Sequence, residues 1–186
     1  DANATHVVYP DEYLQAIHAK LAAPSPDEEL ELNRRGSPEW TADRLWRHSV
    51  TARDGAKVPL SIIYRKDSFK RDGGAPLLLY AYGSYGYSTH ASFDSTRVSL
   101  LDRGFVFAIA HIRGGQEMGR QWYEDGKLLK KKNTFTGFIE VAKYLVEEQW
   151  TTPERMTCQG GSAGGLLIGA VVNMAPEMFV AAHAAV

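Results

Sequence analysis

Apolar residues in the middle of the chain occur in the short runs that β-strands produce. Residues 45–51 alternate between apolar and polar side chains, Asp54-Gly55 supplies a turn signal, and residues 58–64 form a returning run. This pattern predicts an antiparallel pair of strands. The runs at 76–82 and 105–112 are almost continuously apolar, which is typical of strands that are buried on both faces of a sheet.

Helical patterns separate these strands. A helix is expected over 95–102, and apolar residues recur at helical spacing over 134–148. A strand-like run at 155–159 is followed by a helical run at 166–174, and residues 180–186 predict the beginning of another buried strand. Strands that alternate with helices predict an α/β fold with a mostly parallel sheet, helices on both faces and right-handed crossovers.

The first part of the chain has a different pattern. Residues 6–9 are compatible with a strand and residues 11–22 with a weakly amphipathic helix, and proline and acidic residues then interrupt the pattern at 24–29. We predict that residues 1–44 form a connector or the edge of another domain, so that the main domain comprises residues 45–186.

Composition and charge limit the classes of function that we expect of the protein. The chain has 186 residues, of which 44% are hydrophobic and 23% charged, as expected of a soluble globular domain. Its net charge of −1 gives no reason to expect binding to nucleic acid or to an anionic membrane. No apolar run approaches the ~20 residues that cross a bilayer. The first residues show no signal peptide and no initiator methionine, so we expect the chain to be a piece of a longer protein.

The lone cysteine, Cys158, lies in the predicted strand 155–159. Two interpretations are a redox thiol and a small core residue, and the strand context favours the core residue. A single cysteine also excludes a disulfide within the chain.

The segment Gly160-Gly161-Ser162-Ala163-Gly164-Gly165 lies between this strand and the helical run 166–174. A glycine-flanked serine between a strand and a helix is the pattern of the nucleophile elbow of α/β-hydrolases. Glycines are needed there because the turn is strained and the helix packs closely against the sheet. The alternative is a glycine-rich turn whose serine only caps the helix. We favour the elbow, with Ser162 as a nucleophile at a helix N-terminus that stabilises a developing anion.

A serine nucleophile requires a histidine base and an orienting acid, which follow the serine along the chain in α/β-hydrolases. After Ser162 the sequence contains one histidine, His183, and one acid, Glu177. We interpret His183 as a strand or core-edge residue, and His90 and His111 precede the serine. The triad is therefore expected to be incomplete within these residues.

An oxyanion hole is assigned only in part. The residue after the nucleophile, Ala163, is expected to donate its backbone N–H. The second donor is expected near the end of the run 76–82, where Tyr80, Tyr82 and Tyr85 carry hydroxyl groups. One such donor is typically worth ~2.7–4 kcal/mol of transition-state stabilisation. Spacing alone does not choose among the three tyrosines, and packing roles for all of them are compatible with it.

Two further segments carry positive charges, Arg113 at a predicted strand end and the run Lys130-Lys131-Lys132 before the predicted helix 134–148. For Arg113, the alternatives are a substrate carboxylate, an ion pair with an acid, or a role in shaping the loop, and the ion pair is favoured. The run Lys130-Lys131-Lys132 is interpreted as a solvated patch rather than a binding site.

The stretch from about residue 45 to residue 186 resembles the prolyl oligopeptidase family of serine peptidases, and its oligopeptidase B branch in particular. The segments that carry the resemblance are Thr51-Ala52-Arg53-Asp54-Gly55, Tyr82-Gly83-Ser84-Tyr85-Gly86, residues 99–106, Ile112-Arg113-Gly114-Gly115, residues 121–127, residues 130–135 and Gly160-Gly161-Ser162-Ala163-Gly164-Gly165. Residues 1–44 resemble the family only loosely, and by position they would be the end of its β-propeller and the link to the catalytic domain.

The resemblance implies an α/β-hydrolase fold and a cytoplasmic endopeptidase that cuts short peptides after Lys or Arg, with no cofactor and no metal. Carried over by position, it makes Ser162 the catalytic nucleophile, and Tyr82 and Ala163 the side-chain and backbone donors of the oxyanion hole. The family's triad aspartate and histidine, and the acids that hold the P1 side chain, would fall after Val186. The 186 residues would then be an incomplete peptidase domain, which we expect to be inactive alone.

Two positions depart from the family's pattern. Oligopeptidase B often has acidic residues where this chain has His90 and Ser92, which predicts a weaker preference for a basic P2 residue. A helix position that is usually acidic is Gly137 here, and we expect this change to affect only helix stability. The alternatives to an oligopeptidase B-like enzyme are another α/β-hydrolase, such as an esterase or an acylaminoacyl-peptidase-like exopeptidase, and a non-catalytic binding domain.

Overall fold

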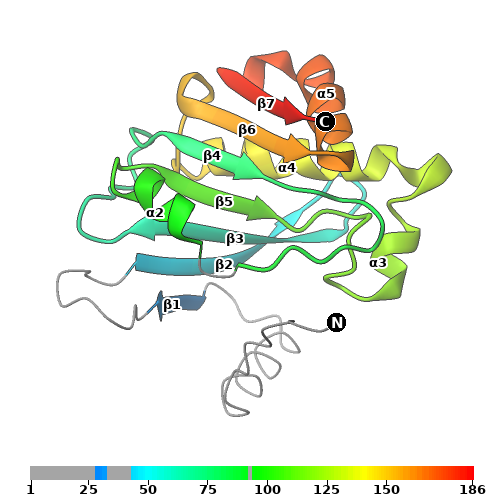
Figure 1. Cartoon of the computed structure of the whole chain (residues 1–186), viewed down its shortest axis with the longest axis horizontal. Helices are drawn as coiled ribbons and strands as arrows, with labels where there is room; N and C mark the ends of the chain where they lie inside the picture. The colour runs from blue at the N-terminus through cyan, green and yellow to red at the C-terminus, as the bar shows by residue number, and fades with distance from the viewer. Residues whose placement is uncertain (1–27, 33–42, 92–93) are drawn as a thin grey trace, which may run out of the picture.

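The computed structural model describes residues 28–32, 43–91 and 94–186, which form a seven-stranded sheet with helices on both faces (Figure 1). Across the sheet the strands follow the order β1-β2-β3-β5-β4-β6-β7. They are β1 (Glu28–Leu32), β2 (Asp43–Thr51), β3 (Lys57–Arg65), β4 (Leu77–Tyr80), β5 (Val106–Ala110), β6 (Met156–Gly161) and β7 (Ala181–Ala185).

The sheet is antiparallel at one side and parallel at the other. β2 and β3 pair antiparallel, from Asp43 opposite Arg65 to Thr51 opposite Lys57, and β3 pairs antiparallel with β5. β5, β4, β6 and β7 run parallel to one another. The predicted antiparallel pair and the mostly parallel sheet are therefore confirmed. Because β4 lies between β5 and β6, the carboxyl ends of these strands meet at one edge, where α/β sheets place their sites.

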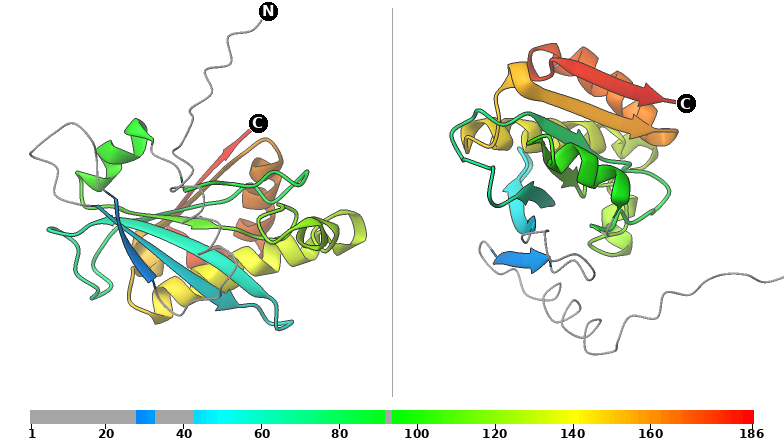
Figure 2. Two further views of the ribbon diagram at one scale, coloured as in Figure 1. Left: turned by 90° about the horizontal axis from the view of Figure 1, so that it is seen from below. Right: turned by 60° about the vertical axis from the view of Figure 1, so that its left-hand side comes forward.

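Helices cover the two faces of the sheet (Figure 2). α2 (Ser95–Leu101) lies on one face, and α4 (Lys132–Glu147) and α5 (Ala163–Met174) lie on the other. Short connections form α3 (Arg120–Glu124) and the 3-10 turns η1 (Leu128–Lys130), η2 (Pro153–Arg155) and η3 (Pro176–Met178). The helices predicted at 95–102, 134–148 and 166–174 are confirmed, with α5 beginning at Ala163. Among the described residues, no helix combines the length and the apolar character that crossing a bilayer requires.

Each face of the sheet has its own apolar cluster. Neighbouring residues of β5 alternate between them, as the pleat of a strand requires: Ala108 and Ala110 belong to the larger cluster under α4 and α5, and Phe107 and Ile109 to the smaller one under α2. On α4, Phe138 is fully buried in the larger cluster. Burying such a side chain stabilises the fold by about 1.5–3 kcal/mol, so the apolar stripe of α4 fixes the helix on the sheet.

Two strands differ from the sequence-based predictions. β7 forms as predicted, but residues 181–184 are exposed, so the prediction that this strand is buried is wrong for the described residues. The reason is that β7 is the last strand of the described sheet and pairs only with β6. β1 was not predicted, because the acidic residues of Glu28–Leu32 obscured its alternation, and it pairs antiparallel with β2.

The expectations for residues 6–9 and 11–22 lie outside the described residues. The assignment of residues 1–44 to a connector or a second domain stays a prediction.

Candidate active site

Ser162 stands at the junction of β6 and α5 in a backbone conformation that is rare for residues other than glycine. Its φ is 54° and its ψ is −117°. It occupies the N-cap position of α5, yet its exposed side chain makes no capping hydrogen bond. A capping serine has an extended backbone and accepts a hydrogen bond from the first turn of the helix. The geometry therefore favours a nucleophile elbow over a simple helix cap.

Close backbone contacts hold this turn. The Ser162 N–H donates to the Ala185 carbonyl oxygen of β7 at 3.0 Å, and the Ser162 carbonyl oxygen accepts from the Gly165 N–H at 2.9 Å. A β-carbon added to Gly160 would lie 2.4 Å from the Gly164 carbonyl oxygen, so no side chain fits where β6 passes the first turn of α5. The elbow thus needs glycine for steric reasons, as the sequence pattern predicted.

Tyr82 and Ala163 flank the same helix N-terminus. A β-carbon added to Gly164 would lie 3.6 Å from Tyr82 Cα and 3.7 Å from Tyr82 Cδ2, so the Tyr82 residue packs against the first turn of α5. Ala163 is the first residue of α5 and directly follows Ser162. The first N–H groups of a helix lack intrahelical partners and carry a partial positive charge. The fold therefore brings together Ser162, Ala163 and Tyr82, the three residues that the family resemblance implies.

The neighbouring tyrosines occupy different environments. Tyr80 stacks on Phe107, with ring centroids 6.4 Å apart, and burial raises the pKa of its hydroxyl. Tyr85 has a φ of 57° and is 79% exposed. Tyr82 is half-buried and packs edge-on against Tyr87 at 5.4 Å. Within the described residues, the Tyr82 hydroxyl has no hydrogen-bond partner, so it is available as a donor.

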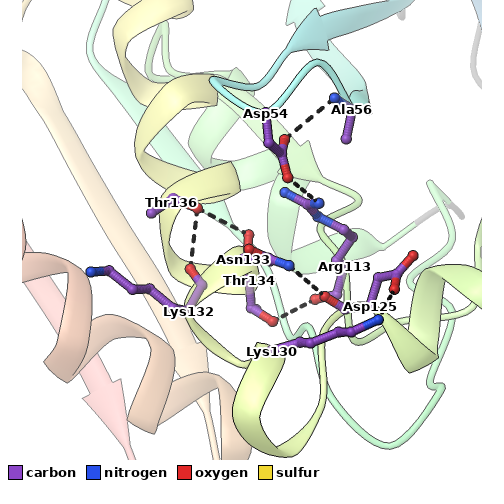
Figure 3. A network of polar contacts seen from close by, with 9 residues as sticks. All are labelled: Asp54, Ala56, Arg113, Asp125, Lys130, Lys132, Asn133, Thr134 and Thr136. Carbon is purple, nitrogen blue, oxygen red and sulfur yellow. Dashed lines mark hydrogen bonds and ion pairs between the residues drawn. The ribbon is translucent and has the colours of Figure 1, made fainter.

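The start of α4 joins the loops that surround this edge of the sheet (Figure 3). The Thr134 hydroxyl donates to the Arg113 carbonyl oxygen at 2.7 Å and lies 3.1 Å from the Gly126 carbonyl oxygen. A β-carbon added to Gly114 would lie 2.1 Å from the Gly83 carbonyl oxygen, so the loops after β4 and β5 touch through their backbones. The loop after β4 is therefore fixed by segments that are distant in sequence.

Arg113 forms an ion pair with Asp54 in the turn between β2 and β3 (Figure 3). Arg113 Nη1 lies 2.5 Å from Asp54 Oδ2, and the arginine side chain is only 7% exposed. This hydrogen bond holds the pKa of the Asp54 carboxyl below its ordinary value. The ion pair that the sequence favoured for Arg113 is thus confirmed, and it fixes the hairpin to the loop after β5.

The lysine run before α4 does not form one solvated patch. Lys130 is exposed and ion-paired, and Lys132 is exposed. Lys131 is half-buried, and its Nζ donates to the Gly83 carbonyl oxygen at 2.5 Å and to Ser84 Oγ at 2.6 Å. The interpretation as a solvated patch is therefore wrong for Lys131. The charge pattern gave no signal for this contact, because its acceptors are neutral and lie far away in sequence.

The described part of the chain offers Ser162 no general base. No histidine or carboxylate in it forms a hydrogen bond with the Ser162 hydroxyl. His183 is exposed on β7, in register with Gln159 of β6. His111 is buried, and its Nε2 lies 2.8 Å from Ser61 Oγ. His183 is thus a strand residue, as expected of it.

Cys158 is a buried residue of β6 that is 1% exposed, and burial raises the pKa of its thiol to about 12. An inert thiol of this kind confirms the core interpretation over a redox role. Within residues 28–32, 43–91 and 94–186, no group of at least three His, Cys, Asp or Glu side chains is arranged to hold a metal ion.

Comparisons with known proteins agree with this geometry. Residues 91–186 match the model of the prolyl oligopeptidase family. The chain is 58% identical over 142 residues to dipeptidyl aminopeptidase BI from Pseudoxanthomonas mexicana, covering 76% of this chain and 19% of that protein. It is 50% identical over 141 residues to Protease 2 from Moraxella lacunata, covering 76% of this chain and 20% of that protein.

A solved structure, oligopeptidase B from Leishmania major, superposes with a TM-score of 0.73 at 50% sequence identity, covering 75% of this chain and 19% of that one. The chain spans about a fifth of the length of the curated relatives it matches. The sheet with its helices is that of the α/β-hydrolase fold, as predicted. On the family match and the shared fold together, the chain belongs to the prolyl oligopeptidase family of serine peptidases.

Proposed function

We propose that Ser162 is the nucleophile of a serine peptidase that hydrolyses short peptides after Lys or Arg. The observation that carries the proposal is the backbone of Ser162. Its φ of 54° at a strand-to-helix junction, together with a side chain that makes no capping bond, presents a hydroxyl at a helix N-terminus.

Hydrolysis then follows the route of serine peptidases. Ser162 Oγ attacks the scissile carbonyl carbon while a histidine accepts its proton, and the carbonyl oxygen becomes an oxyanion. The Ala163 N–H and the Tyr82 hydroxyl donate to this oxygen, which their positions beside the first turn of α5 support. The amine leaves with the proton from the histidine, and water hydrolyses the resulting acyl-enzyme.

The base and its orienting acid come, in this proposal, from a part of the protein beyond Val186. Two observations support this: the described residues give the Ser162 hydroxyl no such partner, and the relatives are about four times as long as this chain. The 186 residues alone are then inactive, because losing triad members costs on the order of 10⁴–10⁶ in kcat.

Cleavage after Lys or Arg rests on the likeness to oligopeptidase B from Leishmania major, at 50% identity. The same family resemblance is the ground for proposing that the protein is cytoplasmic and that its substrates are short peptides. It also supports the assignment of residues 1–44 to a connector or the end of a β-propeller. These statements concern the complete protein, of which the described domain is one part.

Substitution of the nucleophile tests the proposal. In the complete protein, Ser162→Ala abolishes hydrolysis of a blocked arginyl amide and leaves binding of the same peptide within about twofold of the unmodified protein. Ser88→Ala, at a partly exposed position in the loop after β4, is the matched control and retains activity. Turnover by Ser162→Ala close to the unmodified rate would instead support a non-catalytic role for the elbow.

A second candidate function is removal of dipeptides from free N-termini, because the relative at 58% identity is named a dipeptidyl aminopeptidase. The two activities differ in their need for a free α-amino group. The two activities are separated by comparing kcat/KM for a dipeptide amide that ends in Arg, with and without an N-terminal blocking group. Equal or faster cleavage of the blocked substrate supports the endopeptidase, and loss of cleavage on blocking supports the aminopeptidase.

A further inference from the structure

Lys131 differs from the lysines beside it. Lys130 forms an ion pair with Asp125 at 2.7 Å, and the Lys132 side chain points away from the polar network in Figure 3. Lys131 instead places its ammonium 2.5 Å from the Gly83 carbonyl oxygen. Three consecutive lysines therefore occupy three different environments, and only the middle one reaches the loop after β4.

The Lys131 ammonium is held by neutral groups. Its second acceptor is Ser84 Oγ at 2.6 Å, and its Nζ lies 5.9 Å from the centre of the Phe135 ring. Burial alone lowers the pKa of Lys131 to about 8, from its ordinary 10.5. A hydrogen bond from a charged donor is about twice as strong as one between neutral groups. The contact with Gly83 is thus a strong one, formed at the expense of burying a charge.

The charged side chains of the neighbouring segments have other partners. In α3 and the turn after it, Lys127 pairs with Glu124 at 2.5 Å, and Asp125 pairs with Lys130. From the loop after β5, Arg113 pairs with Asp54, and the Glu117 carboxylate accepts a hydrogen bond from the Thr89 N–H at 2.8 Å. Within the described residues, none of these groups forms an ion pair with Lys131.

The contact acts on the backbone next to Tyr82. Gly83 directly follows Tyr82 and has a φ of 66°. A β-carbon added to it would lie 2.6 Å from Thr134 Cγ2, so α4 presses directly against this peptide unit. The Tyr82 hydroxyl has no hydrogen-bond partner of its own in the described part of the chain. Its position therefore depends on how firmly the Gly83 backbone is held.

We propose that Lys131 is a positioning residue, which fixes the Gly83 carbonyl and thereby holds the Tyr82 hydroxyl where the oxyanion develops. This inference rests on the proposed function, in which Tyr82 is an oxyanion donor. Lys131 touches neither the substrate nor the reacting atoms. It acts through the backbone, so its loss misplaces a donor that is used mainly in the transition state.

A double-mutant cycle in the complete protein tests this role. The four proteins are the unmodified enzyme, Lys131→Met, Tyr82→Phe and the double variant, each assayed with an arginyl amide. We expect Lys131→Met to lower kcat about tenfold with KM changed less than about twofold. In the Tyr82→Phe background the same change lowers kcat less than about twofold, because the hydroxyl that Lys131 positions is already absent. The matched control, Lys132→Met, leaves kcat unchanged.

Equal losses from Lys131→Met in both backgrounds, no loss at all, or an equal loss from Lys132→Met would overturn the inference. Thermal melts show whether the variants fold, and Lys131→Gln takes the place of Lys131→Met in the same cycle if the latter does not. If Tyr82→Phe alone is silent, the oxyanion role of Tyr82 in the proposed function fails, and the inference fails with it. If Tyr82→Phe is damaging and Lys131→Met is silent, only the inference fails.

Discussion

The two sides of the candidate site are positioned in different ways. Ser162 and Ala163 are placed by a local device, in which a strand end, small residues and a helix start follow one another directly. Tyr82 follows the short strand β4, and its loop is held by α4 through a contact 48 positions away in the sequence. The elbow is thus specified by neighbours along the chain, and the tyrosine loop by neighbours in space.

This difference has a mechanical consequence. Close backbone contacts fix the conformation of the elbow, so no side chain can be added at Gly160 without a shift of the backbone. The loop of Tyr82 depends on hydrogen bonds from Lys131 and on close contact with Gly114, so it is sensitive to side chains outside the site. The effects of substitutions on activity should therefore differ between the two regions, both in magnitude and in pH dependence.

The largest expected effect comes from removing the donor itself. In the complete enzyme, Tyr82→Phe lowers kcat by about 10²–10³, with a much smaller rise in KM, because the lost hydrogen bond acts mainly in the transition state. Tyr80→Phe and Tyr85→Phe serve as matched controls with little effect, and steady-state kinetics on a peptide amide measure all three. A larger loss from Tyr85→Phe would show that the wrong tyrosine has been assigned.

The next largest effect on activity is expected from distorting the elbow without changing a reactive atom. Gly160→Ala forces a β-carbon to within 2.4 Å of the Gly164 carbonyl oxygen. The shift that relieves this clash displaces Ser162, and a displacement of about 1 Å costs on the order of 100-fold in kcat/KM.

Gly169→Ala on α5 is the control for Gly160→Ala, since a β-carbon there meets nothing within 4 Å. It should keep full activity and stabilise the protein by roughly 0.5–1 kcal/mol, because alanine is the better helix former. Chemical unfolding and kcat/KM measured on both variants decide the point. Full activity in Gly160→Ala would contradict the steric account of the elbow.

A smaller effect on kcat is expected from the titration of Lys131, and it should be specific to substitutions that act on the loop of Tyr82. Burial lowers the pKa of Lys131 to about 8, and the protonated form is the one proposed to hold Gly83. The ratio of kcat between the unmodified enzyme and Lys131→Met should therefore be largest well below pH 8 and fall as the pH rises through about 8. A ratio that stays constant across this range would contradict the role of the ammonium.

The contribution of Lys131 to stability should change with pH in the opposite sense to its contribution to kcat. Because the folded pKa of about 8 lies below the ordinary 10.5, the unfolded chain binds more protons than the folded protein between these pH values. The contribution of Lys131 to the free energy of unfolding therefore rises with pH in this window. Urea unfolding of the unmodified protein and Lys131→Met at pH values on both sides of the window measures the difference.

The smallest expected effect concerns the exposed loop after Tyr82. His90 stands where oligopeptidase B relatives often have an acid, and it supplies no fixed negative charge. His90→Asp should raise the preference for a basic over an alanine P2 residue by about 1.5- to 5-fold in kcat/KM, the range of an exposed ion pair. His90→Asn, which has nearly the same shape and no charge, should leave the preference unchanged. An equal preference in all three proteins would show that this loop does not contact P2.

The sequence and the structure agree most closely where the signal is local. The elbow around Ser162 and the helical stripe of α4 depend on residues close in sequence, and both were predicted from pattern alone. Tyr82 packs against the first turn of α5, Tyr80 stacks on Phe107 of β5, and Tyr85 is exposed. These environments depend on contacts in space, so spacing could not distinguish the three tyrosines. Lys131 was misassigned for the same reason, since its partners are a carbonyl and a hydroxyl on another loop.

The central claim is that Ser162 is an activated nucleophile in the complete protein. The most direct measurement is labelling with a fluorophosphonate probe, followed by mass-spectrometric mapping of the modified residue. The account predicts rapid, stoichiometric modification of Ser162 and no modification in Ser162→Ala. An active enzyme that carries the probe on a different residue, or that remains unlabelled, would contradict it.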